Sequence, residues 1–192
     1  MKSLLLDTTF DRLLVAVNTD GNISFLFGAA DKGSTSSNII PKIKEVLEKG
    51  NLDVKDLDCI FVVLGPGSFT GIRIGVCTAE AIAFGVNAVK CGLSVFDGFG
   101  SDELCVIPSR RGYYYFSEKG EMGEISESEL TQKSEFFYRN CLLETGFAVS
   151  DEDYVKNLFA VAEGKIKTNC LTPLEPLYLK KSQAERLREE KK

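Results

Sequence analysis

Gly65-Pro-Gly-Ser-Phe-Thr-Gly-Ile-Arg-Ile-Gly75 is the stretch of sequence that says most about the fold. It lies between an apolar run, Ile60–Leu64, and a pattern of small residues at helical spacing that continues to about Phe84. This order predicts a buried strand, a tight turn and the N-terminus of a helix. A turn of this kind presents backbone N–H groups that can bind an anion or simply begin the helix.

The glycine loop does not match the phosphate-binding patterns that it suggests. A P-loop needs a lysine directly after its second glycine, and Ile72 stands there. The dinucleotide-binding pattern needs a third glycine where this sequence has Thr70. The alternative is a structural turn, in which Gly65 and Gly67 let the backbone bend and Ser68 or Thr70 caps the helix.

The helix after this loop is apolar on nearly every side. One face has almost no side chains, because it consists of Gly71, Gly75, Ala79 and Ala83. Glycine inside a helix costs about 1 kcal/mol relative to alanine, so close packing should offset it. We expect one side of the helix to cover its own sheet. The small-residue face then either packs within the chain or meets a partner chain.

Periodicity predicts the element order β-β-β-α-β-α for the first 97 residues, and so an α/β fold. The first helix should have its cap at Ser36, Ser37 or Asn38 and Pro41 in its first turn. The predicted strands are residues 3–9, 13–18, 23–27, 59–64 and 88–91, and the predicted helices are residues 38–49 and 68–84.

A glycine-rich segment, Gly92–Asp102, predicts a junction between two domains, residues 1–97 and residues 98–192. The second domain should be smaller and also α/β. It begins with strand candidates at Leu104–Ile107 and Tyr113–Phe116 and contains an amphipathic helix over Asp151–Glu163.

Composition excludes several functional classes. The net charge of −5 over 192 residues is unfavourable for a free-standing nucleic-acid binder. No apolar run approaches the roughly 20 residues of a membrane helix, and the first residues do not resemble a secretory signal. We therefore expect a cytoplasmic protein that does not bind a membrane.

The sequence has no histidine and six cysteines without a CxxC pair. This excludes a Ser-His-Asp triad, a Cys-His pair and an imidazole metal site, and it argues against zinc. We expect reduced cysteines that act as small apolar residues, no metal and no cofactor. Asp7-Thr8-Thr9, after the first strand, is either a capped turn or the place where an ATPase would hold magnesium and phosphate.

Four segments, in order, resemble the TsaB (YeaZ) family of tRNA threonylcarbamoyladenosine biosynthesis proteins. The most specific is Gly65–Ala79, which resembles the signature of that family. The others are Leu6–Thr9, Ser109–Gly112 and Leu174–Lys181, so the resemblance spans nearly the whole chain. The chain departs from the family at Pro108-Ser109, where Asp-Ala-Arg is usual, and at Tyr113, where many members have glutamate.

The resemblance implies a two-domain fold of the actin-like ATPase superfamily and a non-catalytic scaffold subunit. Such subunits pair with a TsaD-like catalytic subunit and a TsaE-like ATPase, and touch tRNA only indirectly. From the apolar helices themselves we expect two copies to pair as a homodimer when the partner is absent. The resemblance also implies that both helices of the first domain contact the partner. The residues then expected at the interface are Ile39, Ile43, Val46, Gly71, Ile72, Gly75, Val76, Ala79 and Ala83.

Two other interpretations stay open. In the first, the chain is an enzyme. It is either an actin-like ATPase with its reactive centre at Asp7-Thr8-Thr9, or a peptidase-like enzyme with its reactive centre at Ser68. In the second it is a general protein-interaction module. Arg110 and Arg111 either contact nucleic acid within an assembly or are ordinary solvated arginines.

Overall fold

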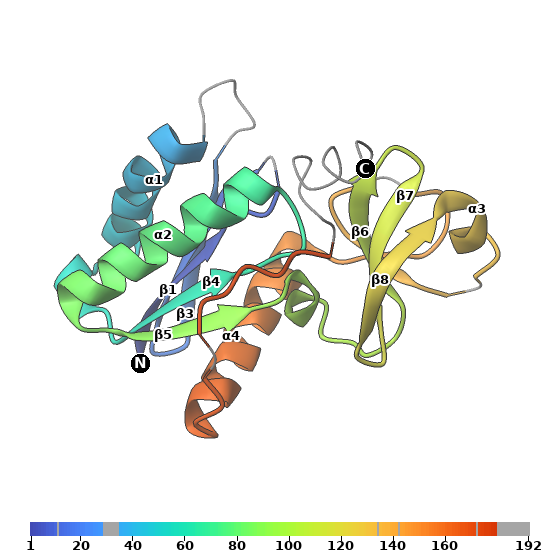
Figure 1. Cartoon of the computed structure of the whole chain (residues 1–192). Coiled ribbons are helices and arrows are strands. Elements are labelled where there is room, and N and C mark those ends of the chain that lie inside the picture. Colours follow the sequence, from blue (N-terminus) through green and yellow to red (C-terminus); the bar gives the residue numbers. More distant parts are fainter. Residues whose placement is uncertain (11, 29–34, 134, 142, 172, 180–192) are drawn as a thin grey trace. The chain divides into compact units, whose positions relative to one another are not determined.

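The structure is a computed structural model that describes residues 1–10, 12–28, 35–133, 135–141, 143–171 and 173–179. The chain divides into two units (Figure 1). Unit 1 comprises Met1–Gly100 and Ser150–Pro176, and unit 2 comprises Ser101–Val149 and, of the described C-terminal residues, 177–179. The sequence predicts one boundary near residue 97, but the chain returns to unit 1 at Ser150. The reason is that helix α4 (Asp151–Lys167) buries its apolar side within unit 1.

Unit 1 is built on a five-stranded sheet with the spatial order β3-β2-β1-β4-β5. The first three strands form an antiparallel meander, and β1, β4 and β5 run parallel. All five residues of β4 are buried, as expected for a strand with both faces covered. The strands are β1 (Lys2–Asp7), β2 (Leu14–Thr19), β3 (Asn22–Phe27), β4 (Cys59–Val63) and β5 (Val89–Leu93).

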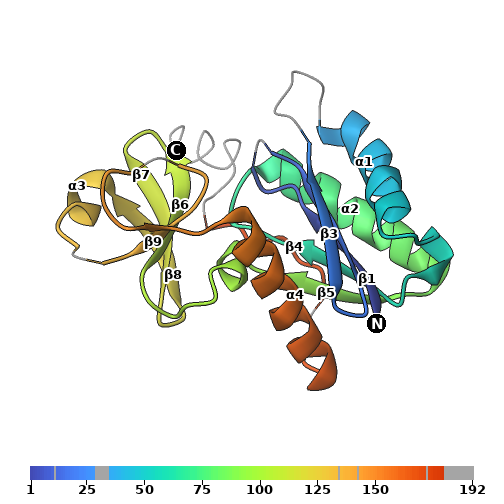
Figure 2. The same ribbon diagram turned by 180° about the vertical axis from the view of Figure 1, so that it is seen from behind.

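Helices cover both faces of this sheet. Helices α1 (Thr35–Lys49) and α2 (Phe69–Val86) lie on one face, and α4 lies on the other (Figures 1 and 2). Successive residues of β4 point to the two opposite helix layers. Val62 lies next to Gly75 of α2, whereas the Phe61 ring packs edge-on against the Phe159 ring of α4, with 5.9 Å between the ring centroids. The expected order β-β-β-α-β-α is therefore present.

Helix α1 begins earlier than the sequence predicts. Its first residue is Thr35, so the predicted caps Ser36, Ser37 and Asn38 lie inside the helix. Pro41 is also in the helix interior rather than in the first turn. Proline lacks the N–H that would continue the helical bonding, which is why the pattern favoured a later start. Two 3-10 turns, η1 (Val54–Asp56) and η2 (Val95–Gly98), complete unit 1.

Unit 2 is a second five-stranded sheet, with the order β10-β9-β6-β7-β8. The unit has a small hydrophobic core that consists of Leu104, Val106, Leu130 and Phe136. Its helix content in the described residues is one turn, α3 (Glu127–Leu130), because the predicted helix at Asp151 belongs to unit 1. The strands are β6 (Cys105–Arg110), β7 (Tyr113–Glu118), β8 (Glu121–Ser126), β9 (Phe137–Tyr138) and β10 (Phe147–Ala148).

Candidate docking surface on helix α2

The glycine loop joins β4 to α2 and lies directly on the end of β1. The Ser68 amide donates a hydrogen bond to the Thr9 carbonyl at 2.6 Å, and a Cβ on Gly67 would come within 2.3 Å of the same oxygen. Gly65 and Gly67 both have positive φ, at 123° and 159°. Glycine is therefore required at these two positions by conformation and, at Gly67, also by space.

Ser68 is the N-cap of α2, and it is one of the two residues, Ser68 and Thr70, that the sequence predicts for this position. Its hydroxyl oxygen accepts a hydrogen bond from the Gly71 amide at 3.2 Å, and its backbone is extended. Thr70 is exposed in the first turn of the helix. The loop thus starts a helix in the ordinary way of a capped N-terminus.

The small-residue face of α2 packs against unit 1 itself. A Cβ on Gly71 would lie 2.0 Å from the Thr8 carbonyl oxygen, and one on Gly75 would lie 2.3 Å from Thr8 Oγ1. The Thr8 hydroxyl also donates to the Gly71 carbonyl at 2.7 Å. The close approach that the glycines allow is therefore between the helix and the end of β1, and it does not create a surface for a partner.

The residues expected at the interface lie mostly inside unit 1. All but one of them are buried there, and Val76 is half-buried. The buried ones are Ile39, Ile43, Val46, Gly71, Ile72, Gly75, Ala79 and Ala83.

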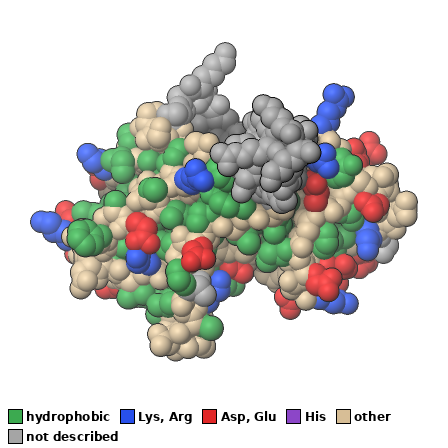
Figure 3. All heavy atoms as spheres, viewed as in Figure 1, with side chains coloured by type: hydrophobic (Ala, Val, Ile, Leu, Met, Phe, Trp, Pro, Cys, Tyr) green, Lys and Arg blue, Asp and Glu red, His purple; other side chains and the backbone are tan. Residues whose placement is uncertain are grey.

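The opposite side of α2 faces solvent and is mostly apolar. Phe84 is 91% exposed, and Cys77 and Ala81 on the preceding turns are also exposed. Arg73 stacks on the Phe69 ring, with its guanidinium carbon 4.0 Å from the ring centroid. Neighbouring Ile40 of α1 is 47% exposed. Figure 3 shows hydrophobic side chains over this part of unit 1, with charged groups between them.

We call Ile40, Arg73, Cys77, Ala81 and Phe84 the outer surface of α1 and α2. The spacing of Cys77, Ala81 and Phe84 is visible in the sequence as a third apolar face of the helix. The sequence alone does not show which of the apolar faces of α2 is covered by the sheet. An exposed apolar surface of this kind on a folded domain is typical of a protein–protein contact.

Helix α2 also has the length and composition of a membrane-spanning helix, and within the described residues it is the one helix that does. This is weak evidence for a membrane, because core helices of globular proteins pass the same test. Here the inner face is covered by the sheet of unit 1, as expected for such a helix.

Asp7, at the end of β1, has its carboxylate committed to internal hydrogen bonds. One oxygen accepts from the Thr9 amide at 2.9 Å and from the Thr9 hydroxyl, and the other accepts from the Tyr154 hydroxyl at 2.8 Å. Asp7 is only 5% exposed. This arrangement matches the capped turn rather than an open magnesium–phosphate site. The sequence placed Tyr154 on an apolar helix face and gave no sign of its partner.

Cys59, Cys105 and Cys141 are poor nucleophiles. Burial raises the pKa of Cys59 and Cys141 to about 11, and that of Cys105 to about 12. Their thiols therefore stay protonated at neutral pH. Cys77 and Cys170 are exposed, contrary to a purely structural role for all six. In the described residues, no group of three or more cysteine or acidic side chains could hold a metal ion.

In unit 2, Arg110 makes contacts within its own sheet. Its guanidinium lies 3.7 Å from the Tyr113 ring centroid and 3.3 Å from the Glu124 carboxylate, which also accepts from the Ser109 hydroxyl at 2.7 Å. Arg111 is exposed in the adjoining turn. Tyr113, one of the departures from the family pattern, thus supports the arginine by stacking on it.

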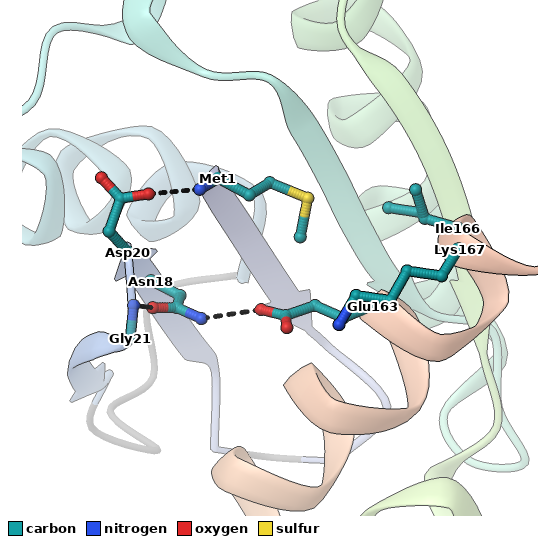
Figure 4. Close-up of a pocket in the computed structure, with 7 residues that line it drawn as sticks. All are labelled: Met1, Asn18, Asp20, Gly21, Glu163, Ile166 and Lys167. Atoms are coloured by element: carbon teal, nitrogen blue, oxygen red, sulfur yellow. Dashed lines mark hydrogen bonds and ion pairs between the residues drawn. The ribbon is translucent and has the colours of Figure 1, made fainter.

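A pocket of about 340 Å³ lies in unit 1, between the β2–β3 turn and the C-terminal half of α4 (Figure 4). Two pairs of polar groups form within its lining. The Met1 ammonium contacts Asp20, and the Asn18 amide donates to Glu163 at 2.9 Å. The polar lining therefore stabilises the junction of these elements. It is far from α2 in the fold, since α4 covers the opposite face of the sheet.

Comparison with known proteins relates the sequence to one pathway. The family model of TsaD, described as tRNA N6-adenosine threonylcarbamoyltransferase, matches residues 33–99. The tRNA threonylcarbamoyladenosine biosynthesis protein TsaB of Escherichia coli K12 is 28% identical over 127 residues, which are 62% of this chain and 54% of that protein. TsaB of Haemophilus influenzae is 34% identical over 124 residues, 60% of this chain and 52% of that protein. The matched part thus spans about half the length of these curated relatives.

Two solved structures share the fold. YeaZ from Pseudomonas aeruginosa has a TM-score of 0.67 and 17% identity, covering 93% of this chain and 99% of that one. A Pseudomonas aeruginosa protein described as similar to peptidase YEAZ has a TM-score of 0.69 with the same identity and coverage. The fold is therefore the expected α/β fold with two sheets, and these two structures share it. The sequence relatives are TsaB proteins, and the solved structures that share the fold are described as YeaZ or as similar to it.

Proposed function

We propose that this chain is a non-catalytic subunit of the machinery that makes threonylcarbamoyladenosine in tRNA, and that it docks on a TsaD-like catalytic subunit. The names of the curated relatives support the pathway. The observation that carries the docking role is the outer surface of α1 and α2, which is exposed and mostly apolar. An apolar helix face in water is stabilised when a partner covers it.

The contacts at the end of β1 support a non-catalytic role. An ATPase of this fold needs a carboxylate free to organise magnesium and phosphate, whereas Asp7 is bonded to Thr9 and Tyr154. Peptidase chemistry at Ser68 would need a base beside the hydroxyl, but this oxygen caps α2 and the sequence has no histidine. Saturable ATP hydrolysis by the purified chain would favour the enzyme instead.

Other partners follow from the same surface. We propose that two copies associate through the outer surface when the catalytic subunit is absent, since each copy presents the same apolar side chains. A TsaE-like ATPase would join the larger complex, and tRNA contact would be indirect. Because the proposed function is modification of tRNA, we also propose a cytoplasmic location.

The test is reconstitution of the modification from purified components. A TsaD-like subunit, a TsaE-like ATPase, the threonylcarbamoyl donor and tRNA are combined with and without this chain. The proposal expects modified adenosine to form only when the chain is present, and a stable complex to elute in size-exclusion chromatography with light scattering. Full modification without the chain, or no association with the catalytic subunit, would refute it.

A further inference from the structure

The chain passes between the two units twice, and both passages are held by the first two turns of α4. It leaves unit 1 after Gly100 and returns at Ser150. On the outgoing segment, the Asn157 side-chain amide donates to the Gly98 carbonyl at 3.1 Å. A Cβ on Gly98 would lie 2.2 Å from the Tyr154 ring, so this segment and α4 are in close contact.

Gly100 shows the same tight packing at the last residue of the outgoing segment. It has a positive φ of 66°, and a Cβ there would lie 2.6 Å from the Asn157 amide nitrogen. Side chains rarely adopt that backbone conformation, and the space is filled by Asn157. Conformation and packing therefore both fix the point at which the chain leaves unit 1.

The returning segment is anchored by Tyr154. Its side chain is 1% exposed, and its hydroxyl donates to Asp7 at the end of β1. Asp151, in the same first turn of α4, pairs with Arg12 at 3.3 Å. A buried hydrogen bond to a carboxylate is among the stronger ones in proteins, so Tyr154 is the principal anchor.

We propose that Tyr154 and Asn157 form a clamp that holds both crossover segments on unit 1, so that unit 2 pivots at Ser101 and Val149. These are the first residues beyond the clamp on each passage. Release of the clamp would extend the hinge into residues 95–100 and 150–153. The proposal concerns the fold alone and does not depend on the proposed function.

The position of the hinge is tested by hydrogen exchange with mass spectrometry on the full chain. Asn157→Ala, alone and with Tyr154→Phe, is compared with Lys156→Ala. Lys156 lies on the same turn of α4, is exposed, and pairs only with Glu152 among its described contacts. Exchange in residues 95–100 should rise about tenfold in the clamp variants and stay unchanged in Lys156→Ala. No change at residues 95–100, or an equal rise across β1 to β5, would overturn the clamp.

The consequence for unit 2 is tested by distance measurement between spin labels at Glu48 and Glu121, which are exposed positions of unit 1 and unit 2. Labelling requires replacement of Cys77, Cys141 and Cys170, the thiols that are not buried. The clamp predicts a distance distribution at least twofold broader in Asn157→Ala than in Lys156→Ala. Equal widths would contradict it. Asn157→Ala is sufficient by itself if the double variant does not fold, because Asn157 is only partly buried.

Discussion

At Gly75 a single missing side chain fixes where a whole helix lies. The Thr8 hydroxyl occupies the space that a Cβ would need, at 2.3 Å, and the Gly71 carbonyl accepts the hydrogen bond from that hydroxyl. The glycine signature that marks the family in sequence thus has a structural explanation in this chain. It lets α2 sit on the end of β1, and it is not itself the partner surface.

A pair of matched glycines tests this explanation. Gly75→Ala should lower the free energy of unfolding by about 1–3 kcal/mol, because the added methyl group overlaps Thr8. Gly85→Ala, on the same helix, has open space at the Cβ and should be neutral or stabilising by up to about 1 kcal/mol. Urea denaturation measures both. Equal effects of the two substitutions would show that Thr8 does not limit the approach of α2.

Asp7 distinguishes a structural from a catalytic role. Asp7→Ala leaves the buried Tyr154 hydroxyl and the Thr9 groups without their acceptor, so the free energy of unfolding should fall by about 2–3 kcal/mol. Thermal and urea unfolding measure this loss. A variant of unchanged stability that has lost nucleotide binding would instead identify Asp7 as a ligand-binding carboxylate.

At the scale of the element, α2 has two apolar sides with different tasks. The sequence predicted the helix, its unusual apolarity and a cap at either Ser68 or Thr70, of which the structure has Ser68. It did not say which apolar side the sheet covers, because apolar periodicity indicates burial without identifying the element that covers the residues. Exposure in the folded chain separates the two: Gly75 and Ala79 face the sheet, whereas Phe84 faces solvent.

Substitution on the outer side should therefore spare the fold. Phe84→Asp is expected to change the free energy of unfolding by no more than about 0.5 kcal/mol, since the ring is 91% exposed. Ala79→Asp, on the inner side, buries a charge beside the sheet and should prevent stable folding. Circular dichroism melts compare the two. A large loss of stability in Phe84→Asp would mean that this side of α2 is covered within the chain.

At the scale of the whole molecule, local patterns predicted the order of the first elements of unit 1. They did not predict that α4 also belongs to unit 1. Strands, turns and helices leave short-range signals such as Asp20-Gly21 and the apolar run of β4. The return of α4 to unit 1 rests on contacts across the sequence, such as Phe61 with Phe159 and Asp7 with Tyr154. A single sequence does not encode these contacts in any local pattern.

The buried thiols predict how stability depends on pH. The pKa of Cys59 is raised by burial from 9.0 to about 11 and that of Cys105 to about 12, so the folded chain holds these protons more tightly than the unfolded chain. The resulting stabilisation is complete below pH 9 and is lost as the pH rises through 11. The Tm should fall over this range, and the fall should be shallower in Cys59→Ala. An identical slope in that variant would exclude the thiol as the cause.

The central claim is that the outer surface of α1 and α2 binds a TsaD-like subunit, and the dissociation constant of that complex tests it most directly. Isothermal titration calorimetry compares the natural chain with Phe84→Asp and with Phe147→Asp, which alters another exposed phenylalanine, in unit 2. The account predicts at least about 30-fold weaker binding for Phe84→Asp, as for an interface hot spot, and an unchanged affinity for Phe147→Asp. Unchanged binding by Phe84→Asp would contradict it.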